Sequence, residues 1–298
     1  MAEGYVLLPE RGVIAVGGAE AVPFLQGLVS NDLAKTTGDR AGYGALLTPQ
    51  GKFLFDFVIL RQGADLLLEV ERERLLALLQ RLTLYRLRAK VTLDDASGRF
   101  AFAAAIGDRV AARFELPEQP GACRPLEDGI ACVDPRLARL GVRVLLPPER
   151  LEPSLQGLGL ARLEPEAYER ARLALGVPDG SRDLVVEKST LLESGFEELG
   201  GVDFAKGCFV GQELTARMKY RGLVRKRLLP VILKGPRPEP GAIIRLGERE
   251  AGEMRSSVDG HGLALLRLDR IAEADQAGTA LVAGPTEGVP VKPDWVNF

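Results

Sequence analysis

The sequence predicts an α+β protein that ends in a small all-β domain. Apolar segments separated by short turns over residues 42–71 are typical of an antiparallel meander, and leucines at helical spacing over 71–85 indicate a helix. After Arg221 the chain consists of short strand-like pieces separated by Gly and Pro. The 298 residues pass the size, roughly 250–300 residues, at which a single core usually stops growing, so we expect two or three domains.

The first half is predicted to run from strand to turn to helix and then into the meander. Residues 12–16 form a short apolar strand, and the Gly17–Gly18 turn leads into a helix over 19–33, with Pro23 in its first turns. The following strands are expected at 43–48, 53–61, 66–70, 90–95 and 100–107. One helix is expected at 71–85, between the third and fourth of these strands.

The second half is predicted to be irregular over 115–160, where Pro and Gly are frequent and one or two strands are expected. A helix from Glu164 or Pro165 to Leu175 has a clear end, because Gly176 and then Pro178 follow it. The domain boundary is placed near Gly222. Strands of the terminal domain are expected at 228–235, 242–248, 252–260, 262–270 and 279–284.

Composition excludes several classes of protein. A formal charge of −2 argues against a protein that coats nucleic acid through its overall charge. The first residues lack the pattern of a secretory signal, and the longest apolar segments are too short to span a bilayer, so we expect a cytoplasmic protein without membrane contact.

Three cysteines form no CxxC pair, which favours reduced thiols. A single histidine, His261, lies in a turn-like DGHG segment, so neither a His-based triad nor a metal site is expected.

Asp56 is the most unusual residue of the meander. In FLFDFVIL it alternates with apolar residues across the strand and is the only polar side chain on either face. A carboxylate in such a row needs a cationic or hydrogen-bonding partner, and such groups are frequent in binding pockets. The alternative is a half-exposed aspartate at a sheet edge.

The segment KGCFVGQE, residues 206–213, brings a thiol, a lysine, an amide and a carboxylate together with two glycines. Lys206 and a helix beginning near Gly211, Gln212 and Glu213 would both favour a thiolate at Cys208. The alternative is a small buried thiol. Residues 206–227 also contain seven basic residues and one acid, a charge that could attract phosphates, carboxylates or nucleic acid, or could be a solvated helix face.

Together these segments resemble the YgfZ-type folate-binding proteins, relatives of the aminomethyltransferase (T-protein) of the glycine cleavage system. The motif KGCFVGQELTAR, with Lys206, Gly207, Cys208, Gly211, Gln212, Glu213 and Arg217, carries the resemblance, supported by FLQGLVSNDLAK, TPQGKFLFDFVIL, RLALGVPDGSRDL and LLESGF. The resemblance implies a three-domain cloverleaf around a central folate pocket. Residues 1–221 would form the folate-binding module, with about 45–135 inserted, and residues 222–298 a C-terminal β-barrel.

The resemblance also implies roles for individual residues. Asp56 matches the acid beside the pterin, a catalytic position in aminomethyltransferases, and Glu193 matches a glutamate that binds the pterin edge. Arg225 is the first choice for an arginine near the glutamyl carboxylate of folate, with Arg227 or Arg221 as alternatives. The implied ligand is tetrahydrofolate or a one-carbon-substituted folate.

The chain departs from the transferases in two places. It continues Glu69-Val70-Glu71 where T-proteins carry Asn-Ala, and it has the Cys208 motif that they lack. The resemblance therefore implies a folate-binding accessory protein that supports iron–sulfur cluster assembly or maintenance in client enzymes, including tRNA-modifying ones, with Cys208 ligating iron or exchanging sulfur. Two alternatives stay open: a folate-dependent aminomethyl or one-carbon transferase using Asp56, and a tRNA-binding factor using the basic residues of 217–227.

Overall fold

The computed structural model describes residues 3–297 and divides the chain into two compact units. Unit 1 contains the chain up to Leu47 and the segments Leu54–Tyr168 and Leu199–Val210. Unit 2 contains Thr48–Phe53, Glu169–Glu198 and the chain from Gly211 onward. The domain limits expected from the sequence, 1–221 and 222–298, stay a prediction.

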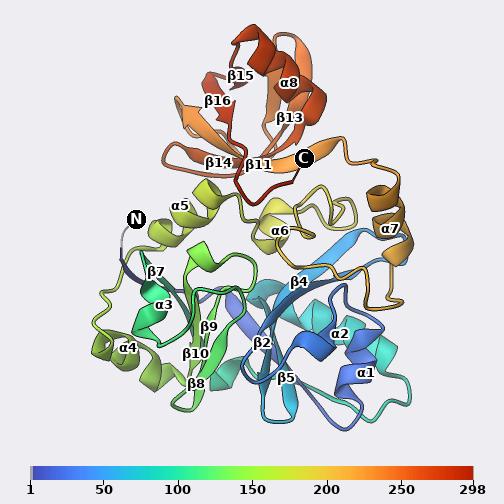
Figure 1. Ribbon diagram of the computed structural model, residues 1–298, viewed down its shortest axis with the longest axis vertical. Coiled ribbons are helices and arrows are strands. Elements are labelled where there is room, and N and C mark those ends of the chain that lie inside the picture. Colours follow the sequence, from blue (N-terminus) through green and yellow to red (C-terminus); the bar gives the residue numbers. More distant parts are fainter. Residues whose placement is uncertain (1–2, 298) are drawn as a thin grey trace. The chain divides into compact units, whose positions relative to one another are not determined.

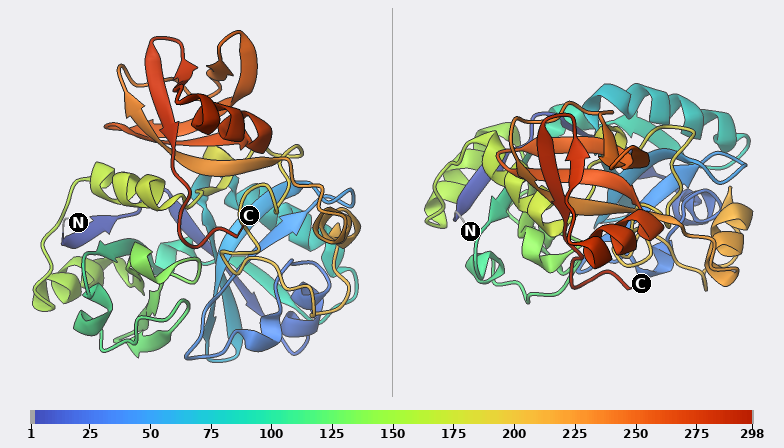
Figure 2. Two further views of the ribbon diagram at one scale, coloured as in Figure 1. Left: turned by 45° about the horizontal axis from the view of Figure 1, so that its top comes forward. Right: turned by 90° about the horizontal axis from the view of Figure 1, so that it is seen from above.

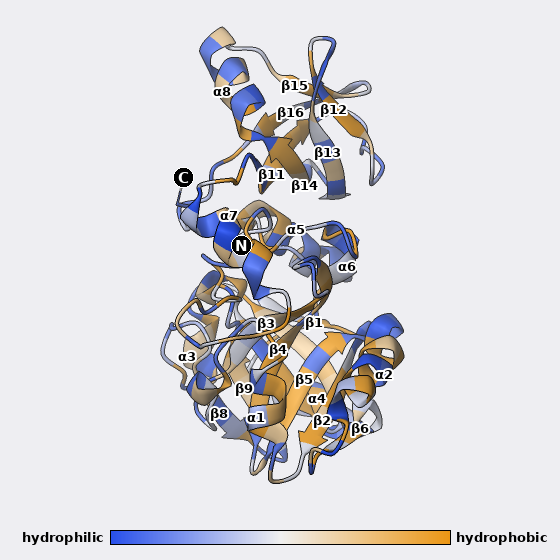
Figure 3. Ribbon diagram, turned by 90° about the vertical axis from the view of Figure 1, so that its right-hand side faces the viewer, coloured by the Kyte–Doolittle hydropathy of each residue, from blue (hydrophilic) through white to orange (hydrophobic). Residues whose placement is uncertain are grey.

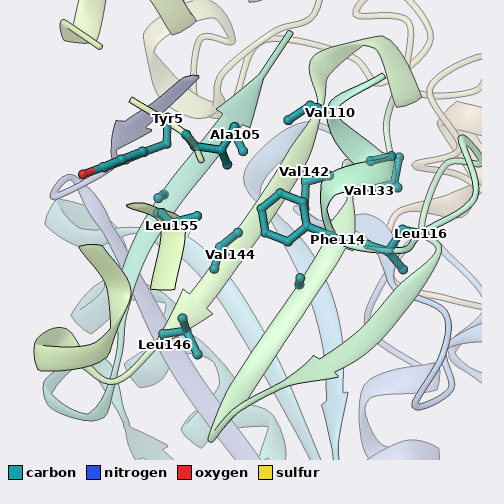
Figure 4. Packing of buried hydrophobic residues seen from close by; sticks show 14 of the residues in the cluster. Tyr5, Ala105, Val110, Phe114, Leu116, Val133, Val142, Val144, Leu146 and Leu155 are labelled. Atoms are coloured by element: carbon teal, nitrogen blue, oxygen red, sulfur yellow. The ribbon is translucent and has the colours of Figure 1, made fainter. Parts of the chain in front are cut away.

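The first sheet of unit 1 has the strand order β1-β7-β10-β9-β8. Every pairing in it that joins neighbouring strands is antiparallel. Its apolar side chains pack against the short helix α3 and against α4, where Phe114, Val144 and Leu155 are among the buried residues (Figure 4). The elements are β1 (Gly4–Leu7), β7 (Ala101–Ile106), α3 (Val110–Arg113), β8 (Cys123–Leu126), β9 (Gly129–Val133), β10 (Val142–Leu146) and α4 (Pro148–Gly157).

The second sheet of unit 1 has the order β3-β4-β5-β2-β6 and contains the predicted meander. Strand β4 is buried over its first eight residues, because apolar side chains occupy both of its faces. Helix α2 packs against β6 and β2, and the apolar character of this sheet is visible in Figure 3. The elements are β2 (Arg11–Gly17), α1 (Ala21–Gln26), β3 (Gly42–Leu47), β4 (Phe53–Gln62), β5 (Asp65–Glu71), α2 (Leu75–Arg86) and β6 (Thr92–Asp95).

Two predictions for unit 1 are wrong. The helix expected over 19–33 ends at Gln26, because Gly27 caps it and the chain then joins β3, where the Ser30 amide donates to the Ala45 carbonyl over 2.9 Å. The region 115–160 is not irregular. It contains β8, β9, β10 and α4, whose strand pairing and burial outweigh the local preference of Pro and Gly for turns.

Unit 2 contains a closed barrel with the strand order β11-β14-β13-β12-β15-β16, so the predicted C-terminal barrel is confirmed (Figures 1 and 2). Its interior is filled by small and branched apolar side chains such as Val231, Ala264 and Leu281. The elements are β11 (Lys226–Lys234), β12 (Ile243–Leu246), β13 (Arg249–Val258), β14 (His261–Arg267), α8 (Leu268–Ala277), β15 (Leu281–Ala283) and β16 (Thr286–Pro290). The sequence did not predict α8, which packs against β14.

Three further helices complete the chain: α5 (Pro165–Leu175), α6 (Gly180–Asp183) and α7 (Gln212–Tyr220). Helix α5 has the predicted bounds, and α7 begins where the motif predicted a helix start. Between residues 3 and 297, every helix is too short or too polar to span a bilayer.

Candidate functional site

Asp56 lies on β4, the second strand of its sheet, and is only 5% exposed, so it is not a half-exposed edge residue. Tyr43 on the neighbouring strand β3 donates a hydrogen bond from its hydroxyl to Oδ2 of Asp56 over 2.8 Å. Burial, followed by the nearby Asp56 carboxylate, raises the pKa of Tyr43 well above its ordinary value. Tyr43 therefore remains a hydrogen-bond donor, and Asp56 its acceptor, throughout the physiological pH range.

Tyr43 contacts one end of a buried network in which arginines alternate with acidic residues. The Arg136 guanidinium carbon lies 5.7 Å from the centre of the Tyr43 ring. Arg136 also donates to both carboxylate oxygens of Asp134, over 3.0 and 2.8 Å, and to the Tyr168 hydroxyl over 3.1 Å. This paired geometry fixes the guanidinium in one orientation beside the Tyr43 ring.

The network continues across the two sheets of unit 1 to Glu69. Arg143 donates to Asp134 over 3.2 Å and to Glu69 over 2.9 Å, and Arg11 donates to the other Glu69 oxygen over 3.0 Å. Burial alone would raise the pKa of Asp134 and Glu69, but the arginine charges outweigh it. They lower the pKa of Asp134 to about 2 and that of Glu69 below its ordinary value. Both acids are thus ionised at neutral pH.

Glu69 is the first residue of the Glu69-Val70-Glu71 stretch that the sequence analysis singled out. Its side chain is fully buried between Arg11 and Arg143. The sequence did not single out Arg11, Asp134 or Arg136, since each stands close to other charged residues. Arg143 is the one charged residue in the apolar segment LGVRVLL, so it carried the same signal as Asp56 and was missed. Burial, at 4–7% exposure for the arginines and 1% for Asp134, distinguishes all four from surface charges.

Lys206 holds the cysteine loop in place. Its ammonium group donates to the carbonyl oxygens of Gln26, Val29 and Asn31 over 2.8, 2.5 and 2.8 Å, at the end of α1 and just beyond it. The Gln26 carbonyl is the last of α1 and lies at the negative end of the helix, where a cation is stabilising. Burial lowers the pKa of Lys206 to about 8, while the charges of Asp32 and Asp203 favour the ammonium form.

Cys208 is exposed between two anchored neighbours, whereas Cys123 and Cys132 are buried. Phe209, next in the chain, is 8% exposed and lies 5.3 Å from the Lys206 ammonium, and the Val210 amide donates to the Gly27 carbonyl. Gly207 has φ of +92°, a conformation that side chains disfavour. The backbone turns at Gly207 and directs the Cys208 thiol to solvent. The alternative of a small buried thiol is therefore wrong.

The second half of the motif opens helix α7 in unit 2. Gly211 precedes the helix with φ of +82°, and Glu213 lies exposed in its first turn. Arg217 is exposed and lines an open depression of about 840 Å³ together with Gln212, Tyr220 and Arg221. The turn at Gly51 packs against this helix, since a Cβ there would lie 2.6 Å from the Cβ of Leu214.

Glu193 and the candidate arginines also lie in unit 2. Glu193 is half-buried, and its Oε2 accepts a hydrogen bond from the Thr190 hydroxyl over 2.7 Å. Arg227 is buried and paired with Glu198 over 2.8 Å. Arg225 is exposed and makes no ion pair within the described part of the chain, so of these two arginines it is the one able to meet an anion.

Metal binding by residues of this chain alone finds no support in the described range, since residues 3–297 contain no group of three or more His, Cys, Asp or Glu placed to hold an ion.

The fold is that of an aminomethyltransferase T. The solved structure of the glycine cleavage system aminomethyltransferase T from Bartonella henselae matches with a TM-score of 0.78 at 17% identity, covering 99% of this chain and 87% of that chain. Residues 225–298 match the family model of the CAF17 C-terminal β-barrel domain. The expected α+β fold with a T-protein-like architecture is confirmed.

Sequence similarity narrows the class to one family. The mitochondrial iron–sulfur cluster assembly factor IBA57 of Mus musculus is 35% identical over 89% of this chain and 77% of its own length. The human protein of the same name is 36% identical over the same shares. The chain belongs to the IBA57 family, of which the YgfZ-type proteins are the bacterial counterpart. The expected cytoplasmic localisation is wrong on this comparison, because these relatives are named as mitochondrial proteins.

Proposed function

We propose that this protein acts in iron–sulfur cluster assembly and that Cys208 is the residue that meets iron or sulfur. Its relatives are named as iron–sulfur cluster assembly factors. The observation that carries the role of Cys208 is its exposure on a loop fixed on one side by Lys206 and on the other by Phe209. A thiol held in this way loses little conformational freedom when it binds a cluster on a partner.

The thiolate is the form that reacts. As a soft ligand it can occupy one coordination position of a cluster carried by a partner protein, or it can exchange with a partner's sulfur. One exposed thiol cannot hold an ordinary cluster, which needs four protein ligands, so the remaining ligands must come from the partner.

The experiment is rescue of iron–sulfur enzyme activity in cells that lack the protein. Wild type should restore the activity and Cys208→Ala should not, although it should fold and accumulate normally. Leu87→Ser, a change at a residue that is 88% exposed and outside the motif, is the matched control and should rescue fully. Full rescue by Cys208→Ala would exclude the thiol mechanism, and no rescue by wild type would exclude the role in assembly.

We further infer that the protein binds tetrahydrofolate or a one-carbon-substituted folate. Each of the three candidate residues has a side chain that suits one part of this ligand. Asp56 and Glu193 are carboxylates that can accept N–H bonds from a pterin, and exposed Arg225 can pair with a glutamyl carboxylate. Tyr43 supports this role by holding one oxygen of Asp56 in a fixed position.

Calorimetric titration with tetrahydrofolate tests the folate proposal. Asp56→Ala should abolish binding. Arg225→Met should weaken binding more for a polyglutamylated folate than for the pterin alone, while Arg221→Met, its exposed neighbour, should leave it unchanged. Wild-type affinity for Asp56→Ala would contradict the assignment of Asp56.

We also propose that Arg217 and Arg221, two exposed arginines among the basic residues of 217–227, contact tRNA. Lys219 is already paired with Glu197 and Arg227 with Glu198, which reduces the charge available to a phosphate backbone. Replacing Arg217 and Arg221 by Ala should weaken tRNA binding and lower its salt dependence by about two phosphate contacts. Binding that is unchanged by both substitutions would exclude this surface.

A further inference from the structure

Cys123 and Cys132 are two buried thiols that the proposed function does not use. They face each other directly across the antiparallel pair β8–β9. The Cys123 amide donates away from β9, to the carbonyl of Asp39 over 2.8 Å, whereas the Val133 amide donates to the Ala122 carbonyl. Cys123 and Cys132 therefore form a non-hydrogen-bonded pair, in which the Cα atoms approach to about 4.5 Å. A disulfide needs a Cα separation of roughly 4.4–6.8 Å.

The two thiols lie on the same face of the hairpin. Residues directly opposite on neighbouring strands place their side chains on the same face of the sheet, and Cys123 is opposite Cys132. The Cys123 thiol donates to the Gly121 carbonyl over 3.1 Å. The hydrogen bond to Cys123, together with burial, raises the pKa of Cys132 well above its ordinary value. The register thus places the two thiols opposite each other, which is the arrangement that a cross-strand disulfide needs.

Only one of the two thiols can be reached from solvent. Cys123 lines an open cavity of about 820 Å³ in unit 1, together with Lys35, Asp39, Arg40, Gln119 and Ala122, whereas Cys132 is fully buried. Arg40 presents a cationic group to the cavity beside the Asp39 carboxylate, whereas the charge of Lys35 is paired with Asp203. Arg40 can attract a carboxylate of a small anionic reagent, whose first contact must be with Cys123.

We propose that Cys123 and Cys132 are a redox couple that closes a cross-strand disulfide when a small anionic disulfide, of the glutathione disulfide type, enters this cavity. This modification site is independent of Cys208 and of the role in cluster assembly. The disulfide would join β8, the edge strand of its sheet, covalently to β9.

The reaction consists of two exchanges. Cys123 loses its proton, and its thiolate attacks one sulfur of glutathione disulfide, whose S–S bond breaks to release one glutathione thiolate. Cys132 then loses its proton and attacks Sγ of Cys123, which forms the protein disulfide and releases the second glutathione thiolate. The two departing thiolates take up the two protons. In total, two protein thiols are oxidised and one glutathione disulfide is reduced to two glutathione molecules.

The test uses the full chain with Cys208→Ser, so that only the two buried thiols remain. After incubation with glutathione disulfide the protein is denatured, alkylated with N-ethylmaleimide and weighed by intact-mass spectrometry. The expected product has lost two hydrogen atoms and carries no alkyl group, and its peptide map joins residues 123 and 132. Two alkylated thiols, or a stable glutathione adduct without this crosslink, would overturn the proposal.

Two further variants separate the steps. Cys132→Ala should stop at one glutathione adduct on Cys123, and Cys123→Ala should leave Cys132 unmodified because no reagent reaches it. Arg40→Met should slow the reaction with glutathione disulfide several-fold but leave that with uncharged hydroxyethyl disulfide unchanged. Equal slowing of both reagents would refute the role of cavity charge. If a buried substitution prevents folding, the peptide map of the Cys208→Ser protein still decides the matter.

Discussion

Replacing Lys206 by Met tests whether the ammonium group fixes the cysteine loop. The change keeps an unbranched side chain of similar length but removes the three hydrogen bonds to the carbonyls of Gln26, Val29 and Asn31. If each hydrogen bond contributes a net value of about 1 kcal/mol to the free energy of unfolding, the three bonds together contribute up to about 3 kcal/mol. Lys206 is half-buried, so water can replace part of this interaction, and we expect a loss of about 1–3 kcal/mol.

Urea unfolding measures the change in global stability, and native-state hydrogen exchange measures the loop. The Val210 amide, which donates to the Gly27 carbonyl, should lose protection in Lys206→Met before the sheets of unit 1 do. Lys35→Met is the matched control, because that lysine is 64% exposed and pairs only with Asp203 near the same loop; it should change stability less. Unchanged stability and unchanged Val210 protection in Lys206→Met would refute the anchoring role.

Three further predictions concern acid stability, two glycines and thiol reactivity. The folded-state pKa of Asp134, about 2, lies below its ordinary value of 3.8, so its ionised form stabilises the fold above pH 3.8. About 2 kcal/mol of the free energy of unfolding should be lost as the pH falls from about 4 to 2. In Asp134→Asn the free energy of unfolding, measured by urea titrations at several pH values, should depend less on pH over this range. Gly207→Ala should cost about 1 kcal/mol, through backbone strain alone, because no atom lies within 4 Å of the added Cβ. Gly51→Ala should lower the free energy of unfolding more than Gly207→Ala does, because its Cβ would also clash with Leu214 and the Gly211 carbonyl. Urea unfolding measures both variants, and equal decreases would contradict this difference. Under native conditions maleimide should label Cys208 at least tenfold faster than the buried cysteines; comparable rates would argue against its presentation to solvent.

Residues with strong local signals were predicted well from the sequence. Strand β4 was found within one residue at its end, because eight successive residues are apolar except for Asp56. Helix α5 was found at both ends, because Pro165 and Gly176 are strong boundary signals. The KGCFVGQE motif correctly indicated a helix start near Gly211, whereas it left open whether the Cys208 thiol is buried.

Features that depend on distant contacts were not predictable. Strands β8, β9 and β10 look irregular by composition. Pairing of β10 with β7, of β9 with β10 and of β8 with β9 is what makes them strands. Arg136, which lies beside the Tyr43 ring, comes from more than ninety residues further along the chain, and nothing in a linear sequence links the two residues. The contact of Cys123 with Cys132 likewise depends on hairpin register, which spacing alone does not reveal.

The buried network from Asp56 to Arg11 also restricts how the sequence can diverge. Three arginines share the carboxylates of Glu69 and Asp134 inside unit 1, and removal of either acid would leave an excess of buried positive charge at a cost of about 3–5 kcal/mol. Replacement of Glu69 or Asp134 alone by a neutral residue is therefore a barrier to divergence, whereas replacement of an acid together with an arginine that pairs with it is not. Among relatives, these positions should change together, as compensated sets, and should record shared ancestry more faithfully than the freely varying surface around them.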